Sequence, residues 1–341
     1  MAENNEQQTM RAWLYSSASG GLEKALKLSE ATVKPLSGDE VRVKVHSTSL
    51  NPADYKIPEL GMLARLAVST PASPGMDFAG TVVEVGDAIK SADAFRVGEK
   101  VFGRIAPQQH GTLGEFIAAK PEGLARLPDG VSEGDASCVG TAGLTAYQSI
   151  APHVKAGDKI FINGGSGGTG TFGIQFAKAL GCHVTTSCST KNVELVKGLG
   201  ADEVIDYTKE NVSETLKSKG LVFKHVVDNV GTPNDLFKAA DHFLVPDGKF
   251  VQIGGEMSLT STSTLISRSL LPSFLGGGKR SFQFMVLQPK HDGYVHIGEL
   301  MQEGKVKAVI EETFDFQNAP KAFEKLKSKR TRGNVVVKVA K

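Results

Sequence analysis

The stretch INGGSGGTG, residues 162–170, decides the fold of this chain. It follows an apolar run at 159–162 that predicts a buried strand, and it precedes an apolar helix pattern at 172–180. The glycines that match G-x-G-x-x-G are Gly165, Gly167 and Gly170. In that motif glycine permits a tight turn, lets backbone N–H groups approach a pyrophosphate and lets the helix pack on the strand. We therefore predict a dinucleotide-phosphate loop rather than a glycine-rich turn without a ligand.

The residues after the next strand select the cofactor. Where the strand at 183–186 ends, enzymes that use NAD place an acidic residue on the adenosine ribose, and this chain has SCSTK at 187–191. The first acid is Glu194. The side chains available to a ribose 2′-phosphate are Ser189, Thr190 and Lys191. We predict NADPH as the cofactor; the alternative is that Lys191 is an ordinary solvated lysine.

The chain continues in β-α units. Apolar runs at 203–207, 225–231 and 249–255 predict further strands, with a helix between the last two from 233 to 243. Strands that read as continuous apolar runs are typical of parallel sheets buried on both faces. We expect a doubly wound Rossmann sheet with its ligand at the carboxyl ends of the strands.

Composition limits the remaining possibilities. The 341 residues are more than one core normally holds, so two domains are expected. The net charge of +2 gives no reason to expect a nucleic-acid partner, and we find no apolar run that could span a membrane. Three scattered cysteines and a polar N-terminus without a signal peptide favour a reducing compartment, and we predict a cytoplasmic protein.

The first part of the chain follows a different pattern. Short strand candidates, separated by Gly, Pro, Ser and Asp, lie at 10–15, 40–45, 78–85, 100–103 and 113–118. They predict an antiparallel, barrel-like domain. After the β-α units, strand candidates return at 308–316 and 333–339, with a helix at 319–326 between them. We expect this tail to rejoin the first domain.

The order of these motifs resembles the zinc-free quinone oxidoreductase and enoyl reductase branch of the medium-chain dehydrogenase/reductase family. The segments that carry the resemblance are SLNPADYK at 49–56, PGMDFAG at 74–80, VG at 85–86, GTAGLTAY at 140–147, the loop at 165–170 and LGADEVIDY at 199–207. The resemblance runs nearly end to end. It implies an α/β protein with a GroES-like antiparallel β-barrel catalytic domain at 1–127, a Rossmann NADPH-binding domain at 128–280, and a C-terminal return to the catalytic domain at 281–341.

The resemblance also bears on metal. Zinc-dependent members of the family place cysteine, histidine and glutamate where this chain has Asn51, Met76 and Asp77. Its first cysteine is Cys138, and three cysteines cannot supply a four-cysteine structural site. We therefore expect no metal.

Without a metal, hydride transfer needs an acceptor that is already activated by conjugation, such as a quinone or an enone. The resemblance places the segment 51–56 beside the nicotinamide, which makes Asn51, Tyr55 and Lys56 the candidate catalytic residues. Each has a structural alternative. Asn51 would cap the turn before Pro52, Tyr55 would be a packing aromatic, and Lys56 would pair with a surface acid.

The same resemblance assigns further cofactor contacts. The pyrophosphate would lie on Ser166, Gly168 and Thr169. The remaining contacts are Thr145 near the nicotinamide, Tyr207 on the 2′-phosphate or adenine side, Asn229 on the ribose, and Ile253 with Gly254 at the nicotinamide amide. Phe282 and Phe284 would wall the substrate pocket. The family often has lysine after the late glycine, whereas here Asn334 follows Gly333.

Three functions follow from this reading. The first is NADPH-dependent reduction of small-molecule quinones or α,β-unsaturated carbonyls. The second is a specialised enoyl reductase that works beside a biosynthetic synthase, which an apolar tunnel between 60–68 and 270–284 would favour. The third is a non-catalytic relative that binds NADPH or RNA. A homodimer is left open.

Overall fold

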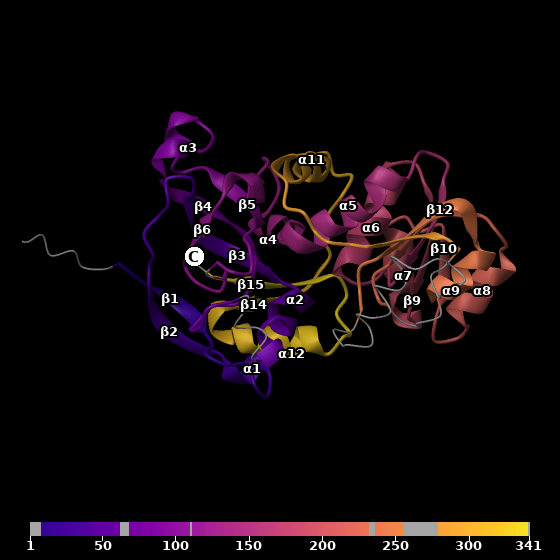
Figure 1. Ribbon diagram of the computed structural model, residues 1–341, viewed down its shortest axis with the longest axis horizontal. Coiled ribbons are helices and arrows are strands. Elements are labelled where there is room, and N and C mark those ends of the chain that lie inside the picture. Colours follow the sequence, from indigo (N-terminus) through magenta and orange to yellow (C-terminus); the bar gives the residue numbers. More distant parts are fainter. Residues whose placement is uncertain (1–7, 62–67, 110, 232–235, 256–278, 340–341) are drawn as a thin grey trace, which may run out of the picture. The chain divides into compact units, whose positions relative to one another are not determined.

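A computed structural model of the chain describes residues 8–61, 68–109, 111–231, 236–255 and 279–339 (Figure 1). The chain divides into two compact units. Unit 1 comprises Met1–Thr141, Pro289–Gly304 and Ala308–Lys341, and unit 2 comprises Ala142–Gln288 and Lys305–Lys307.

This division differs from the boundaries predicted at 127 and 280. Helix α4 (Glu133–Ser137) packs on strands β3 (Val41–Leu50) and β4 (Asp77–Val85), which keeps it in unit 1. Strand β13 (Ser281–Phe284) pairs with β12 (Leu244–Gln252), which keeps it in unit 2. Pairing across long sequence separations therefore moves both boundaries toward the C-terminus.

Unit 2 is built on a six-stranded sheet with the order β10-β9-β8-β11-β12-β13, and every pair in it is parallel. The other strands are β8 (Lys159–Asn163), β9 (His183–Cys188), β10 (Glu203–Asp206) and β11 (Phe223–Asp228). The helices are α5 (Leu144–Ile150), α6 (Gly168–Ala179), α7 (Val193–Gly198), α8 (Val212–Ser218) and α9 (Leu236–Ala239). This is the predicted Rossmann sheet.

Both faces of that sheet are buried, as parallel strands require. One apolar cluster joins Phe161 and Val226 of the strands to Leu216 of α8 and Leu236 of α9. A second cluster joins the neighbouring strand residues, such as Ile162 and Val227, to α5, α6 and α7. Successive strand residues therefore serve opposite layers, and the sheet is doubly wound.

Phe282 belongs to the first of these layers. Its ring lies 4.9 Å from that of Phe237 and 6.1 Å from that of Phe250, so it packs in the aromatic core of unit 2. The prediction that it walls a substrate pocket is replaced by a packing role, while Phe284, two residues on, is exposed. Most of the predicted apolar tunnel, 62–67 and 270–278, lies outside the described residues.

Unit 1 holds a seven-stranded sheet with the order β14-β15-β3-β4-β5-β7, and β6 pairs with β3. The remaining strands are β5 (Lys100–Arg104), β6 (Phe116–Ala119), β7 (Leu124–Arg126), β14 (Ile310–Asp315), β15 (Asn334–Lys338) and the separate pair β1 (Thr9–Leu14) and β2 (Lys27–Thr32). The helices besides α4 are α1 (Leu22–Ala25), α2 (Pro52–Lys56), α3 (Asp87–Ser91), α11 (His291–Gln302) and α12 (Ala319–Lys327).

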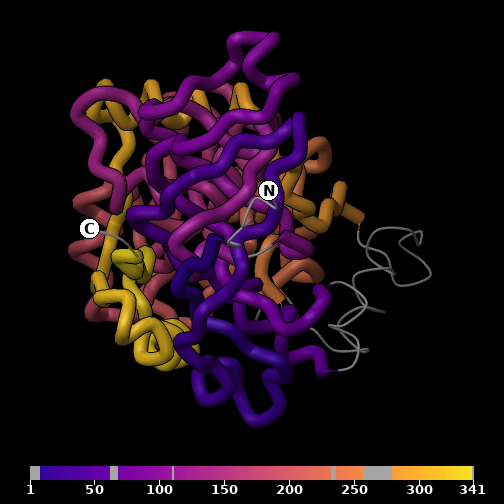
Figure 2. The backbone as a smooth tube through the Cα atoms, turned by 90° about the vertical axis from the view of Figure 1, so that its left-hand side faces the viewer, coloured from indigo at the N-terminus to yellow at the C-terminus, as the bar shows by residue number. Residues whose placement is uncertain are grey.

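The tail rejoins unit 1 as predicted: β15 pairs antiparallel with β3, and the yellow C-terminal part of the trace returns to the indigo N-terminal part in Figure 2. The predicted antiparallel pattern has one exception. β14 and β15 are parallel because α12 connects them as a crossover helix. Among the described residues, no helix is long and apolar enough to cross a membrane.

Candidate functional site

The predicted phosphate loop joins β8 to α6 in unit 2, and its three motif glycines have different surroundings. A Cβ atom on Gly165 would lie 2.1 Å from Thr186 Oγ1, and one on Gly170 would lie 2.2 Å from the carbonyl oxygen of Gly164. A Cβ atom on Gly167 would meet no atom nearer than 3.9 Å. Packing thus explains the first and third glycines. The protein's own atoms do not require the second, so the space beside Gly167 suits a ligand that approaches the backbone.

Hydrogen bonds fix the start of this loop to the neighbouring strands. Ser187 Oγ donates to Asn163 Oδ1 at 2.6 Å and accepts from the Gly164 amide at 2.9 Å. Asn163 Nδ2 donates to Asp228 Oδ1 at 2.8 Å. These bonds hold the carboxyl ends of β8, β9 and β11 together, at the edge where an α/β sheet binds its ligand.

Asn229, Ile253 and Gly254 lie at the same edge. Asn229 Nδ2 donates to the carbonyl oxygen of Asn163 at 3.0 Å, whereas its Oδ1 is buried and has no donor among the described residues. The amides of Ile253 and Gly254 both donate to the Asp228 carbonyl. The structure thus brings three predicted cofactor residues next to the phosphate loop.

The segment predicted to bind a 2′-phosphate follows β9. Ser189 begins a short 3-10 turn, Thr190–Asn192, and Lys191 is exposed on it. The Thr190 hydroxyl donates to Asp206 Oδ2. It therefore serves a carboxylate of the protein, one that ends the neighbouring strand β10 and that the sequence analysis did not consider.

Asp206 is held in its ionised form. The hydroxyl of Thr190 and the hydroxyl and amide of Thr208 donate to its carboxylate, and these bonds lower the pKa of Asp206 to about 2. Lys209 Nζ lies 3.7 Å away. The Asp206 carboxylate thus already accepts hydrogen bonds from Thr190 and Thr208. The side chains that remain available to an anion are those of Ser189 and Lys191.

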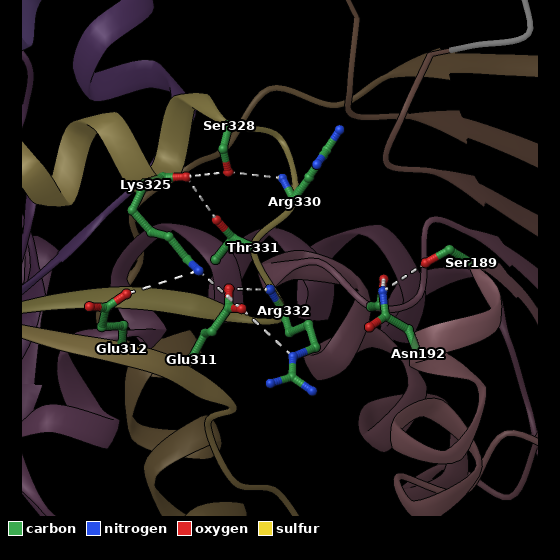
Figure 3. Close-up of polar contacts among 10 residues, drawn as sticks. Ser189, Asn192, Glu311, Glu312, Lys325, Ser328, Arg330, Thr331 and Arg332 are labelled. Atoms are coloured by element: carbon green, nitrogen blue, oxygen red, sulfur yellow. Dashed lines mark hydrogen bonds and ion pairs between the residues drawn. The ribbon is translucent and has the colours of Figure 1, made fainter.

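Asn192 is a residue that the sequence analysis missed. It is buried, and its Nδ2 donates to Ser166 Oγ of the phosphate loop at 3.1 Å. The same Nδ2 donates to Ser189 Oγ at 3.2 Å, as Figure 3 shows. Asn192 therefore links two predicted cofactor residues. An asparagine that begins a helical stretch reads as an ordinary cap in the sequence, so no signal distinguished it.

The other predicted cofactor residues are dispersed around this edge. Gly168 and Thr169 form the first turn of α6 and are half-buried. Thr145 is buried in α5. The Tyr207 side chain, directly after β10, is exposed.

In unit 1, the predicted catalytic residues surround α2. Asn51 precedes this helix, and its amide donates to Asp54 Oδ2 at 2.6 Å, which satisfies one of the free N–H groups at the helix start. Tyr55 is buried and Lys56 is half-buried. The bond to Asp54 agrees with the capping alternative for Asn51, but Asn51 also makes a second contact.

That second contact belongs to a buried polar network centred on Asp77. Asn51 Nδ2 donates to Asp77 Oδ2 at 2.8 Å. Thr141 donates its amide to the same oxygen at 2.8 Å and its hydroxyl to Asp77 Oδ1 at 2.6 Å. Arg104 Nε donates to Thr141 Oγ1 at 3.0 Å. The charge of Arg104 also lies near the carboxyl groups of Asp54 and Asp77. Asp77 thereby joins the candidate catalytic segment to Thr141, which ends the first of the three segments of unit 1.

Burial perturbs both carboxyl groups. Removal from water and the nearby charge of Asp77 raise the pKa of Asp54 to about 8. Burial also raises the pKa of Asp77, to about 6, although Thr141, Arg104 and Asn51 favour its ionised form. The pKa of Asp54 is shifted further because the Asp77 charge adds to the effect of burial, whereas the neighbours of Asp77 offset its burial. Asp54 Oδ1 is also buried without a partner among the described residues.

Tyr55 lies beside a second group of charges. Lys327 Nζ of α12 is 5.6 Å from the centre of the Tyr55 ring and pairs with Glu23 at 2.7 Å and Glu59 at 2.8 Å. Burial and the Glu59 carboxylate raise the pKa of Tyr55. The phenol therefore keeps its proton at neutral pH.

Asn51, Met76 and Asp77 stand where the resemblance places the zinc ligands of metal-dependent relatives, and here these residues bond to other side chains of the protein. Besides the Asn51–Asp77 bond, Arg104 Nη2 lies 3.0 Å from Met76 Sδ. Within the described ranges, no three His, Cys, Asp or Glu side chains gather as they would around a metal ion.

Comparison with known proteins relates both units to dehydrogenases. Two family models match the chain, the alcohol dehydrogenase GroES-like domain over residues 37–129 and the zinc-binding dehydrogenase over residues 199–337. The chain is 46% identical to a trans-enoyl reductase of Aspergillus terreus, over 97% of this chain and 96% of that protein. It is 36% identical to a zinc-type alcohol dehydrogenase-like protein of Schizosaccharomyces pombe, over 97% and 96% of the two chains.

A solved structure is similar over nearly the whole chain. The quinone oxidoreductase from Coxiella burnetii superposes with a TM-score of 0.84 and 29% sequence identity, covering 98% of this chain and 100% of that one.

Proposed function

Because the chain belongs to the medium-chain dehydrogenase/reductase family, we propose that it uses NADPH to reduce quinones or α,β-unsaturated carbonyls without a metal. The family implies a nicotinamide cofactor. The choice of NADPH, the metal-free chemistry and the roles of individual residues are our proposals, and each rests on the residues described above.

The observation that carries the proposal is the phosphate loop. Among the described residues, the position beside Gly167 is open and Oδ1 of Asn229 is buried without a donor, and both lie at the carboxyl edge of the sheet. A bound dinucleotide would fill the first, and a ribose hydroxyl would donate to the second. The residues present therefore fit this cofactor.

We assign the contacts of the cofactor by the part of it that each residue would reach. The pyrophosphate would be held by the loop from Gly165 to Gly170, and the 2′-phosphate by Ser189 and Lys191, with Thr190 and Tyr207 beside it. The ribose and nicotinamide would contact Asn229, Thr145, Ile253 and Gly254. No acidic side chain stands between 187 and 191, and the carboxylate of Asp206 is already matched by donors.

NADPH supplies a hydride when it is bound. The substrate's carbonyl oxygen then gains negative charge, which a donor on the protein stabilises. We propose that Tyr55 is this donor, since it lies on α2 beside Asn51 and its phenol, protonated at neutral pH, can donate to the oxygen. Lys56 is the second candidate, and Asn51 shapes the pocket through its bond to Asp77. The proton that the donor gives up is bound to the acceptor after reduction.

Metal-free chemistry is supported by the residues at the former ligand positions. An amide, a thioether and a carboxylate that is bonded to Thr141 and Asn51 are a poor set for zinc, which prefers thiolate and imidazole. We expect activity to survive exhaustive chelation. Loss of activity that added zinc restores would contradict this part of the proposal.

A second candidate is a specialised enoyl reductase that works beside a biosynthetic synthase. It is favoured by the 46% identity to a protein named trans-enoyl reductase. A cytoplasmic location and a homodimer stay predictions from the sequence.

A substrate panel separates the candidates. NADPH consumption would be followed with quinones, alkenals, cyclic enones, enoyl thioesters, saturated ketones and primary alcohols. We expect turnover of the conjugated acceptors and little of the ketones and alcohols. Strong preference for enoyl thioesters would select the second candidate, whereas NADPH binding without any turnover would select a non-catalytic relative.

The donor is tested by substitution. Tyr55→Phe should lower kcat by about 10²-fold, as expected for a positioned acid, and leave NADPH affinity unchanged. Lys56→Met tests the second candidate in the same assay, and Tyr147→Phe, in unit 2, is the control. If only KM rises, the residue binds substrate and the proton comes from elsewhere.

A further inference from the structure

Asn192 links the two places at which the proposed cofactor carries phosphate. We propose that Asn192 is a specificity-determining residue, which turns the hydroxyl hydrogens of Ser166 and Ser189 toward the ligand and so selects a dinucleotide with a third phosphate. The inference rests on the proposed function, because it assigns the direction of two hydroxyls within the proposed NADPH site.

The geometry is that of one amide group serving two serines. Asn192 Nδ2 lies 3.1 Å from Ser166 Oγ and 3.2 Å from Ser189 Oγ (Figure 3 draws the bond to Ser189). Ser166 stands in the loop between β8 and α6, and Ser189 follows β9. Both distances are those of N–H donors, since hydroxyl donors approach an oxygen more closely, at about 2.7–2.8 Å.

Proton counting then fixes the direction of the serines. An asparagine NH₂ group carries two hydrogens, and Asn192 uses one for each serine oxygen. A serine oxygen that accepts from Asn192 cannot direct its own hydrogen at Asn192. Each hydroxyl hydrogen therefore points elsewhere, and both serines are half-buried with access to the loop edge. They become donors for an acceptor-only group such as a phosphate.

The other end of Asn192 gives an independent reason to assign it a role in ligand binding. Its side chain is buried, and Oδ1 has no donor within hydrogen-bond distance among the described residues. A buried carbonyl oxygen without a donor costs stability. An apolar residue of similar size would avoid that cost and would fill the same space, but it would leave both serine hydroxyls free to turn. The amide group is therefore explained by what its NH₂ group does.

Through the two serines, Asn192 would affect the binding of both phosphate groups of the cofactor. Ser166 would meet the pyrophosphate, which every dinucleotide carries, and Ser189 would meet the 2′-phosphate, which only NADPH carries. Loss of Asn192 should weaken both contacts, but the loss should be greater for ligands with a 2′-phosphate because only they use both serines.

The experiment measures binding rather than turnover. Calorimetry would give the affinities of the wild type and the variants for NADPH, NADH and 2′,5′-ADP. Asn192→Leu removes the two donors without adding charge, and Asn192→Asp keeps the shape but only accepts, which turns both hydroxyl hydrogens inward. Asn211→Leu is the matched control, because Asn211 is also a helix-capping asparagine of unit 2 and lies on an exposed turn.

We expect Asn192→Leu to weaken NADPH by about tenfold and NADH by about threefold, and Asn192→Asp to weaken NADPH by about a hundredfold. In a Ser189→Ala background, Asn192→Leu should weaken NADPH and NADH equally. Asn211→Leu should leave the ratio of the two affinities unchanged. Thermal unfolding of each variant identifies any that fails to fold, and Asn192→Asp, which matches asparagine in size, then carries the test.

Three outcomes would overturn the inference. An Asn192→Leu variant with the wild-type ratio of NADPH to NADH affinity would remove the link to the 2′-phosphate. Undiminished NADPH affinity in Asn192→Asp would mean that the serines donate to residue 192 instead. If the wild type itself binds neither NADPH nor 2′,5′-ADP, the proposed function fails and this inference fails with it.

Discussion

The phosphate loop of unit 2 and the buried network of unit 1 use polar groups in opposite ways. The loop keeps an open position at Gly167 and side chains such as Asn229 with an unused acceptor, at the edge of a sheet. The network around Asp77 bonds both carboxylate oxygens of Asp77 to its own residues, and it buries two carboxyl groups. The loop is therefore arranged for a ligand, whereas the network holds its own residues in place.

Both regions join residues that are far apart in the chain. Asn163 bonds to Asp228 at the start of the loop, and Thr141 bonds to Asp77 in the network. The regions differ in what their polar groups meet, because the network groups bond mainly to one another, whereas the loop leaves room beside Gly167 among the described residues. A substitution in the loop should thus affect ligand binding, and one in the network should affect stability. The predictions below test this contrast.

The largest effect is expected for Asp77→Ala. It removes the acceptor of both Thr141 donors and leaves Asn51 Nδ2 with only the Ser49 carbonyl oxygen, at 3.3 Å. We expect the free energy of unfolding to fall by about 3 kcal/mol, measured by chemical denaturation. Asp39→Ala is the control, because Asp39 makes an exposed ion pair with Lys120 at 3.1 Å and its loss should change stability little. Equal losses in the two variants would contradict the structural role of the network.

The next effect compares two glycines of one motif. In Gly170→Ala the new Cβ atom would overlap the Gly164 carbonyl, and we expect a loss of stability of about 2 kcal/mol together with a loss of nucleotide binding. In Gly167→Ala the Cβ atom meets open space in the protein, so stability should change by less than about 1 kcal/mol. NADPH affinity should nevertheless fall at least about tenfold, because the methyl group occupies the space of the ligand. Calorimetry and thermal unfolding of both variants measure the two quantities. A Gly167→Ala variant that binds NADPH as the wild type does would mean that the loop holds no dinucleotide.

The two units should also respond oppositely to pH. The pKa of Asp54 in unit 1 is raised from 3.8 to about 8, so the folded state favours its acid form, and stability is lost as pH rises from about 4 to about 8. In unit 2, burial lowers the pKa of His225 from 6.5 to about 4, so stability is lost as pH falls from 6.5 to about 4. Each group contributes a slope of about 1.4 kcal/mol per pH unit within its window.

The variants Asp54→Asn and His225→Gln separate these slopes. Between pH 6.5 and 8, Asp54→Asn should gain about 2 kcal/mol of stability relative to the wild type. In this range the Asp54 carboxyl group is ionised in the unfolded wild type but still largely protonated in the folded one, so rising pH favours unfolding of the wild type alone. His225→Gln should reduce the loss of stability between pH 6.5 and about 4. Denaturation at a series of pH values gives both curves, and a wild-type curve that neither variant alters would show that neither group controls stability.

The features that the sequence predicted are those that depend on neighbours along the chain. The loop at 162–170, the parallel strands around it and the return of the tail all follow from local patterns, and the structure has them. The parallel pair β14 and β15 was missed because the sequence gives no sign of which partner a short strand takes. Phe282 was read as a pocket wall for the same reason, since its partners Phe237 and Phe250 lie far back in the chain.

The parts of the site that the sequence did not predict depend on where a side chain points. Asn192 and Asp206 read as an ordinary cap and an ordinary strand end, and only the fold brings them to Ser166 and Thr190. Lys327 follows Tyr55 by most of the chain, yet it lies over the Tyr55 ring. Contacts between side chains that are distant in the sequence leave no motif by which the sequence could predict them.

The smallest effect is expected at Lys191. Lys191 is exposed on the turn after β9, so its attraction to a 2′-phosphate is weakened by solvent and salt. Lys191→Ala should therefore weaken NADPH by about fivefold, or ~1 kcal/mol, and leave NADH unchanged. Raising the ionic strength should reduce the difference between variant and wild type, since an exposed charge pair is screened. Lys197→Ala is the control, because Lys197 is also exposed and lies one helix further on, paired with Glu194 at 3.6 Å. If the wild type binds NADH as tightly as NADPH, the segment from Ser189 to Lys191 does not read the 2′-phosphate; if only the effect of Lys191→Ala is missing, Ser189 alone reads it.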